Sequence, residues 1–236
     1  MENDLEELSG KEATVYRGLA ATANYLSQDR FDIQFGSKEL CRDMARPSKL
    51  PMIKMKSGAR YLLGTPQMEI EFINQPPPDG ARVYVDSDWA GCLSTRKSTS
   101  AGVVMLGKHC IKTWSTTQKT RATSSAEAEF YAIVEGASRG LGFKSLAADL
   151  GSNLEITLFS DASAGRSLAF RKGLGKVRHI ETKYLWTQDL IKEGRLKLLK
   201  VKGTDNPSDI GTKHLSLAET QTLLSSIGLK LVSRKS

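Results

Sequence analysis

Three aspartates of this chain stand at the ends of apolar segments. Asp86 closes "ARVYVD", Asp161 closes "EITLFSD", and Asp209 follows "RLKLLKV" within "DNPSDIGTK". Short apolar runs bounded by polar and turn residues predict buried strands, so these carboxylates are expected along one edge of a sheet. Carboxylates that are brought together repel one another unless cations neutralise them. The pattern therefore predicts a cation-binding site.

A fourth acid is expected from the helix that begins in "SSAEAEFYAIVEG", where Glu127 and Glu129 compete for the role. Ser124 and Glu127 have the spacing of a capping box, which gives Glu127 a structural task at the helix start. Glu129 has no such task. It shares a helix face with three small or apolar residues, Ala126, Ile133 and Ala137. That face is expected to pack on the sheet, so Glu129 is predicted to reach the aspartates.

Carboxylate oxygens without a nearby cluster of cysteine or histidine favour Mg²⁺, or Mn²⁺, over zinc. Two such ions, typically ~3.5–4 Å apart, hold a phosphodiester, activate a water molecule and stabilise the leaving oxygen. The predicted reaction is therefore hydrolysis of a phosphodiester.

Each acid taken singly also has an ordinary structural explanation. Asp86 and Asp88 suit a turn after a strand, Asp161 a helix cap, Asp209 a helix N-terminus and Glu129 a solvated helix face. The order and placement of the whole set favour the metal site. Three neighbouring residues are interpreted as loop, surface or capping groups: Asp205, His179 and His214.

The charge balance favours an anionic partner. Lys and Arg outnumber Asp and Glu by 34 to 26, which gives a net charge of +8 and suits nucleic acid or an acidic surface. Two basic segments, "STRKSTS" and "RKGLGKVRH", could contact phosphates, or could be a polar turn and a solvated loop. The candidate nucleic-acid-binding residues are Arg96, Lys97, Arg171, Lys172, Lys176, Arg178 and His179.

Cysteine usage and hydropathy indicate an intracellular protein, in the cytoplasm or the nucleus. Cys41, Cys92 and Cys110 are odd in number and widely spaced, which does not fit a disulfide framework or a metal knuckle. No apolar run approaches the ~20 residues that span a bilayer. The acidic start "MENDLEELSG" is unlike a signal peptide. No membrane partner is expected.

The elements that must position the acids fall in the second part of the chain. Residues 1–73 predict a small helical region, with helices over 12–28, 31–45 and 52–64. The proline-rich "NQPPPDG" at 74–80 cannot continue a helix and is predicted to be a linker. Residues 81–236 alternate short strands and helices, which predicts a mixed α/β (α+β) domain. A two-residue hairpin is expected at Gly107, and a capped last helix at Ser216.

Five ordered motifs resemble the ribonuclease H domain that ends the polyprotein of copia-type retrotransposons. They are "YVDSDWAGCLSTRKSTSAGVV", "SSAEAEFYA", "FSDASAG", "RHIETKYLW" and "DNPSDIGTKHL". Residues 16–72, with "YRGLAATANYLSQDRFDIQF" and "ARYLLGTPQ", resemble the end of the preceding reverse transcriptase. The chain is thus identified as similar to the C-terminal part of such a polyprotein, with a remnant of the polymerase.

The resemblance implies a ribonuclease H-like fold, a five-stranded mixed sheet flanked by helices, with its three antiparallel strands first. It assigns the catalytic and metal-binding acids to Asp86, Glu129, Asp161 and Asp209, and favours Asp86 over Asp88. It implies two Mg²⁺ ions, one held by Asp86, Glu129 and Asp161 and the other by Asp86 and Asp209. The implied activity is cleavage of the RNA strand of an RNA–DNA hybrid, with the rest of a retrotransposon polyprotein as a further partner.

The chain departs from the family in two places. It has no motif resembling the Tyr-x-Asp-Asp of polymerases, which argues against polymerisation. The loop "KVKGTDNPSD" lacks the histidine that many relatives place before the last aspartate, so a proton-shuttling role there is unassigned. The alternative to an active nuclease is a catalytically silent fragment that binds nucleic acid. A transposase or integrase is disfavoured because its glutamate normally comes last in the chain.

Overall fold

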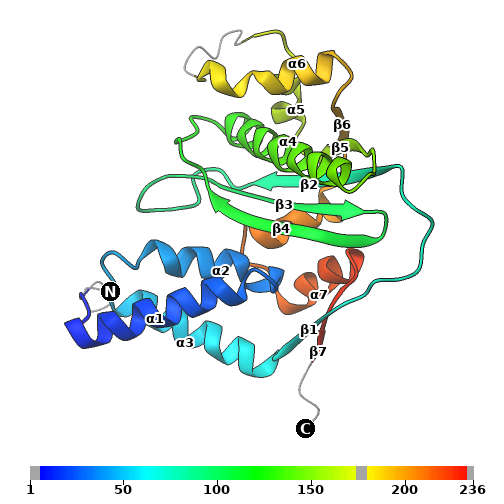
Figure 1. Cartoon of the computed structure of the whole chain (residues 1–236). Helices are drawn as coiled ribbons and strands as arrows, with labels where there is room; N and C mark the ends of the chain where they lie inside the picture. The colour runs from blue at the N-terminus through cyan, green and yellow to red at the C-terminus, as the bar shows by residue number, and fades with distance from the viewer. Residues whose placement is uncertain (1–5, 174–179, 233–236) are drawn as a thin grey trace. The chain divides into compact units, whose positions relative to one another are not determined.

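The computed structural model describes residues 6–173 and 180–232 and divides the chain into two compact units (Figure 1). The first unit combines residues 1–70 with residues 229–236, and the second spans residues 71–228. The proline-rich stretch 74–80, predicted as a linker, therefore lies just inside the second unit. Each unit has its own buried core.

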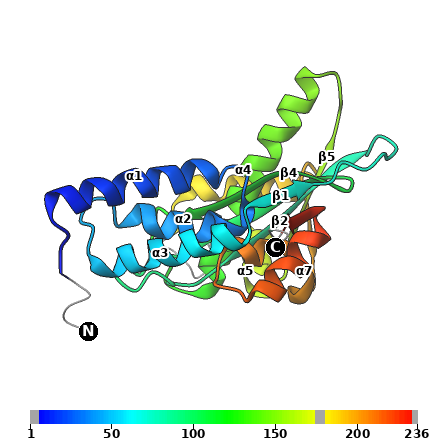
Figure 2. The ribbon, with the colours of Figure 1, turned by 90° about the horizontal axis from the view of Figure 1, so that it is seen from below.

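The first unit is a layer of helices with a short strand pair. Residues 6–70 form α1 (Gly10–Leu26), α2 (Phe31–Arg42) and α3 (Lys49–Gly64), which Figure 2 shows side by side. Ser9 and Glu12 form a capping box at the start of α1. The small core of this unit consists of Tyr16, Ala20, Leu40 and Met55. The three predicted helices are thus present.

Two features of the first unit differ from the sequence prediction. The i, i+3, i+4 spacing of Tyr16, Leu19 and Ala20 predicts that all three lie on the buried face of α1. Leu19 is instead 46% exposed, because the buried face runs through Ala13, Tyr16 and Ala20. The sequence predicted one domain over residues 81–236, but the second unit ends at Gly228. Strand β7 (Leu229–Val232) pairs antiparallel with β1 (Gln67–Ile70), and this non-local pairing joins the chain end to the first unit.

The second unit is built on the predicted five-stranded mixed sheet. Among the described residues its strands lie in the order β4-β3-β2-β5-β6. Strands β2, β3 and β4 are antiparallel, and β5 and β6 run parallel to β2 and to each other. Their bounds are β2 Gly80–Ser87, β3 Thr99–Leu106, β4 His109–Thr117, β5 Glu155–Ser160 and β6 Lys197–Lys200. Three antiparallel strands followed by two parallel ones give the ribonuclease H-like fold.

Helices cover both faces of this sheet. Figure 1 shows α4 (Ser125–Asp149), α5 (Ser163–Ala169) and α6 (Trp186–Lys192) on one side and α7 (Leu217–Ser226) on the other. Short 3-10 helices complete the unit: η2 Thr182–Tyr184, η3 Gly203–Asp205 and η4 Pro207–Gly211. Gly107 has a φ of 62° in the β3–β4 hairpin, as the turn chemistry predicted. In the part of the chain that the structure describes, no helix is both long and apolar enough to cross a bilayer.

Close packing of α4 on β2 fixes where the helix begins relative to the strand end. Val83 and Val85 of β2 are fully buried in the same core as Ile133 and Ala137 of α4. A Cβ atom added at Gly136 would lie 2.3 Å from Val85 Cγ1, so the helix lies directly on the strand. This contact holds the first turns of α4, with Glu129, beside the end of β2.

Replacement of Gly136 tests this contact. We expect Gly136→Ala to destabilise the protein by about 1–3 kcal/mol, because the new methyl group overpacks the α4–β2 interface. Gly142→Ala, in the same helix, is the matched control, because an added Cβ there meets no described atom within 4 Å. The control should gain about 0.5–1 kcal/mol from helix propensity. Urea unfolding followed by circular dichroism measures both, and equal effects would contradict the packing.

Candidate active site

Asp86 and Asp161 are brought together by two parallel strands. In the register of β2 and β5, Tyr84 pairs with Phe159, and the two rings stack with centroids 5.0 Å apart. Asp86 and Asp161 each lie two residues beyond this pair. Asp86 belongs to β2 and Asp161 follows the last residue of β5, so both carboxylates lie at the same edge of the sheet. Asp86 is only 7% exposed, and Thr212 Oγ1 donates a hydrogen bond to its Oδ2.

Glu129 reaches this edge from α4. Its neighbours on the helix, Ile133 and Ala137, are fully buried, as predicted from the spacing. Helix α5 passes so close that a Cβ atom added at Gly165 would lie 2.5 Å from Glu129 Cβ. The backbone N–H of Ser87 donates to the Glu129 carboxyl. Glu129 Oε2 is buried and has no hydrogen-bond partner among the described residues.

Asp209 enters from the segment after β6. Asn206 caps η4 by accepting a hydrogen bond from the Ser208 backbone N–H, which sets the conformation that carries Asp209. Asn206 is fully buried, and its Nδ2 donates to Val85 O at 3.0 Å and lies 3.5 Å from Asp161 Oδ1. A single amide thus ties the Asp209 segment to the ends of β2 and β5.

The four acids act on one another electrostatically. The pKa of Asp86 is raised to about 7, chiefly by burial. The charges of Asp209 and Asp161 add to the rise, and the hydrogen bond from Thr212 opposes it. Burial raises the pKa of Glu129 to about 9, with additional contributions from Asp86, Asp161 and Asp209. The structure therefore brings together the four residues that the sequence predicted.

Three of the four acids have protein partners in this structure. Asp86 accepts from Thr212, Asp161 lies near Asn206, and Asp209 Oδ2 forms an ion pair of 2.8 Å with Lys213 Nζ. As they stand, no three His, Cys, Asp or Glu side chains among residues 6–173 and 180–232 are arranged to hold a metal ion. The donor set still fits a hard cation, because it consists of carboxylates, one with a buried unpartnered oxygen.

The two rejected acids have structural roles. Glu127 is 1% exposed, and its carboxylate accepts hydrogen bonds from the Thr123 backbone N–H, the Thr123 hydroxyl and Tyr131. The predicted capping box is thus modified. The Ser124 side chain accepts from the Glu127 backbone N–H, but the Glu127 carboxylate is bound by Thr123 instead of by Ser124. Asp88 closes the start of the β2–β3 loop, because it accepts from the Thr99 backbone N–H and donates its own N–H to Thr99 O.

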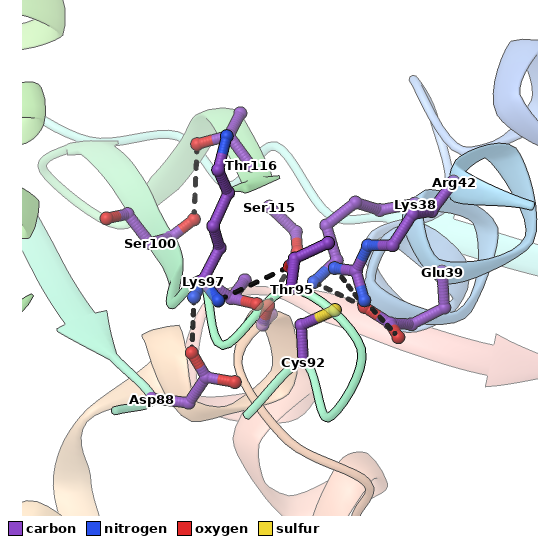
Figure 3. Close-up of polar contacts among 12 residues, drawn as sticks. Lys38, Glu39, Arg42, Asp88, Cys92, Thr95, Lys97, Ser100, Ser115 and Thr116 are labelled. Atoms are coloured by element: carbon purple, nitrogen blue, oxygen red, sulfur yellow. Dashed lines mark hydrogen bonds and ion pairs between the residues drawn. The ribbon is translucent and has the colours of Figure 1, made fainter. Parts of the chain in front are cut away.

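The loop that carries two predicted phosphate contacts lies next to this edge of the sheet. Figure 3 shows Asp88 and Lys97 in the loop and Ser100 and Thr116 behind it, where Thr116 Oγ1 donates to Ser100 O at 3.4 Å. Arg96 is exposed and has a φ of 54°. Lys97 is half-buried.

The second predicted basic segment follows α5, the helix that packs on Glu129. Arg171 and Lys172 are exposed just after its last turn. Lys176, Arg178 and His179 lie outside the described residues. Binding of nucleic acid by all seven residues stays a prediction.

Sequence reasoning missed four residues that position the acids: Gly165, Asn206, Thr212 and Lys213. The last two had a signal, because they follow Asp209 by three and four residues and so return to its side in a helical turn. Gly165 had none, because its partner Glu129 is distant in the chain. Asn206 precedes Pro207, a pattern typical of the start of a helical turn, but that pattern does not indicate its contacts with the strand ends.

The raised pKa of Glu129 predicts how the stability of the metal-free protein depends on pH. The unfolded carboxyl titrates near 4.5 and the folded one at about 9, so the folded state holds an extra proton between these values. The contribution of protonated Glu129 to the free energy of unfolding is fully present below the pKa of the unfolded state. It is lost as the pH rises through the pKa of the folded state. In EDTA, the free energy of unfolding should therefore fall between about pH 5 and pH 9.

Two variants isolate this effect in urea unfolding at several pH values. Glu129→Gln stays neutral, so its stability should vary less with pH over the upper half of that range. Asp205→Asn, at an exposed carboxylate, should follow the wild type. A Glu129→Gln profile as steep as that of the wild type would show that Glu129 is not the titrating group.

The known proteins that match most of this chain include retrovirus-related Pol polyproteins of plant transposons. The chain is 30% identical over 222 residues to the retrovirus-related Pol polyprotein from transposon RE1 of Arabidopsis thaliana. It is 28% identical over 186 residues to that from transposon TNT 1-94 of Nicotiana tabacum. The matches cover 93% and 78% of this chain but only 15% and 14% of those polyproteins. No protein-family model matches the chain.

Solved structures with a similar arrangement include LC11-RNase H1 isolated from compost. It is 14% identical, with 57% of this chain and 93% of that chain covered and a TM-score of 0.40. The prototype foamy virus protease-reverse transcriptase is 12% identical, with 78% and 27% covered and a TM-score of 0.38. The strand order β4-β3-β2-β5-β6 and the strand directions identify the fold. The chain is therefore a relative of the Pol polyproteins of copia-type retrotransposons, and its second unit has the ribonuclease H-like fold that the motifs predicted.

Proposed function

We propose that the chain is a metal-dependent endonuclease that hydrolyses the RNA strand of RNA–DNA hybrids. The observation that carries the proposal is the meeting of four carboxylates from four elements at one edge of the sheet, with Glu129 Oε2 buried and unpartnered. A buried acid cluster without an evident structural role is typical of a functional site. The relationship to Pol polyproteins supports nucleic acid as the substrate.

The residues that would hold Mg²⁺ are Asp86, Glu129, Asp161 and Asp209, with Mn²⁺ as a substitute. When bound, such ions supply charge for the phosphodiester, a more acidic water and stabilisation of the leaving oxygen. The chain itself provides the fixed geometry. Packing of α4 on β2 holds Glu129, and the register of β2 and β5 holds Asp86 and Asp161.

Supporting groups orient these carboxylates toward the substrate. Thr212 holds one oxygen of Asp86, and Asn206 ties the Asp209 segment to the strand ends. Gly165 lets α5 approach Glu129, so that the acid is enclosed on the helix side. These contacts restrict the rotation of the acids and lower the cost of ordering them when the substrate binds.

Binding of nucleic acid requires the charge of the cluster to be overcome. Four carboxylates repel a phosphodiester, so we expect tight binding at the site only with divalent cations present. The exposed cations Arg96, Arg171 and Lys172 are proposed to contact phosphates further along the hybrid. Recognition of RNA on one strand would use its 2′-hydroxyl groups.

A second candidate function is binding of nucleic acid without cleavage. The ion pair between Asp209 and Lys213 favours it, because that acid already has a cationic partner. The chain spans only 15% of the length of the first relatives, the Pol polyproteins. The remaining parts of such a polyprotein are proposed partners.

Replacement of Asp161 distinguishes the two functions. The wild type should cleave the RNA strand of a labelled hybrid in Mg²⁺, and Asp161→Asn should lose at least about a hundredfold in rate, equal to about 2.7 kcal/mol. Asp205→Asn is the control, because Asp205 is an exposed acid of the neighbouring η3 turn. It should cleave like the wild type. Hybrid binding without Mg²⁺-dependent cleavage by the wild type would leave the second function.

Replacement of the cations after α5 tests the proposed pairing with phosphates. In an Asp161→Asn background, which prevents cleavage, Arg171→Ala with Lys172→Ala should weaken hybrid binding. The slope of log K against log salt should become shallower by about 0.7–0.9 for each phosphate that the variant no longer neutralises. Lys192→Ala, at an exposed position at the end of α6, should keep the slope. If the Asp161→Asn protein and both of its variants show the same salt slope, Arg171 and Lys172 do not contact phosphates of the hybrid.

A further inference from the structure

The ion pair between Lys213 and Asp209 places a cation of the chain inside the acid cluster. Lys213 Nζ lies 2.8 Å from Asp209 Oδ2, and the two residues are four apart in the sequence. The Lys213 side chain is 52% exposed, whereas that of Asp209 is 18% exposed. The Lys213 ammonium also interacts through space with Asp86 and Asp161. The cation therefore faces three of the four acids from the solvent side.

The contacts of the acids differ in kind. Asp86 is held by a hydroxyl group and Asp161 lies near an amide, and neutral donors such as these leave further lone pairs free for a cation. Asp209 is held by a full positive charge. A divalent ion bound to Asp209 would be repelled by an ammonium on the same carboxylate. The ion pair must therefore open before a metal ion can bind at Asp209.

Lys213 is suited to such an opening. Its ammonium is a point charge on a flexible stem, unlike the fixed fork of an arginine. Its half-exposed position lets the charge turn outward without being buried unpaired. When it leaves Asp209 it remains at the rim of the site, where a polyanionic backbone would provide new partners.

We propose that Lys213 is an internal counter-ion, which occupies Asp209 in the metal-free protein and is exchanged for a divalent cation there. The released ammonium then pairs with a phosphate of the bound nucleic acid. This inference rests on the proposed function of the same four acids. It makes the ion at Asp209 the weaker of the two in the absence of nucleic acid, because Lys213 contacts Asp209 directly, whereas its charge acts on Asp86 and Asp161 only through space.

Titration of the protein alone with Mn²⁺, followed by calorimetry and by electron paramagnetic resonance, tests the exchange without any activity measurement. Lys213→Met should bind the second ion about fivefold more tightly, because no ammonium competes for Asp209. The affinity for the first ion should change less, because the ammonium acts on Asp86 and Asp161 only through space. Lys213→Arg keeps the competing charge and should keep the weak second site. Lys192→Met, at an exposed position on α6, should match the wild type at both sites.

Hybrid binding gives the second readout. In an Asp161→Asn background with Mg²⁺, Lys213→Met should bind the hybrid more weakly, with a salt slope shallower by the equivalent of about one phosphate. Lys213→Gln removes the same charge if the methionine variant does not fold, as judged by circular dichroism.

The outcomes separate this inference from the proposed function. If the wild type binds two Mn²⁺ ions and removal of the Lys213 charge changes neither affinity, the counter-ion role is wrong and the nuclease proposal stands. Looser binding of the second ion after removal of the charge would also overturn the exchange. If the wild type binds no divalent ion and does not cleave, the proposed function itself fails.

Discussion

Repulsion among four carboxylates is the constraint on which the structure of the site depends. Burial and mutual charge raise the pKa of Asp86 to about 7 and that of Glu129 to about 9, so the cluster costs stability when it is ionised. A fold tolerates such a cost only where surrounding packing leaves the side chains no alternative. Here the packing is the contact of α4 with β2, where Gly136 lies directly against Val85. The core of the second unit, formed by α4 and the sheet, surrounds this contact.

The change of strand direction within the sheet explains why the acids meet at this edge. Strand β2 is antiparallel to β3 but parallel to β5, so the two strands that carry Asp86 and Asp161 end together. Their connection, through α4, crosses one face of the sheet and delivers Glu129 to the same edge. The segment after β6 contributes Asp209 and is tied to the end of β2 by the Asn206–Val85 hydrogen bond. Topology therefore determines the site more than local sequence does.

Sequence reasoning succeeded where the signal was local. Strand ends marked Asp86 and Asp161, and the helical spacing of Ile133 and Ala137 separated Glu129 from Glu127, whose carboxylate is bound by Thr123 and Tyr131. It failed where the signal was tertiary. The pairing of β7 with β1 joins segments about 160 residues apart in the chain, and the approach of Gly165 to Glu129 depends on how two helices cross. The pattern of α1 was ambiguous, because Leu19 and Ala20 both fit a helical face and only Ala20 is buried.

The supports of the site divide into fixed and exchangeable ones. Thr212, Asn206 and Gly165 act through neutral contacts in the interior, and a cation can add to the acids that they hold without displacing them. Lys213 acts through charge at a half-exposed position, so its contact with Asp209 competes with any other cation. The neutral contacts therefore fix where the carboxylates lie. The exchangeable charge of Lys213 sets how readily Asp209 can bind another cation. In the metal-free protein Lys213 therefore reduces, with one positive charge, the repulsion that the acids impose on the folded state.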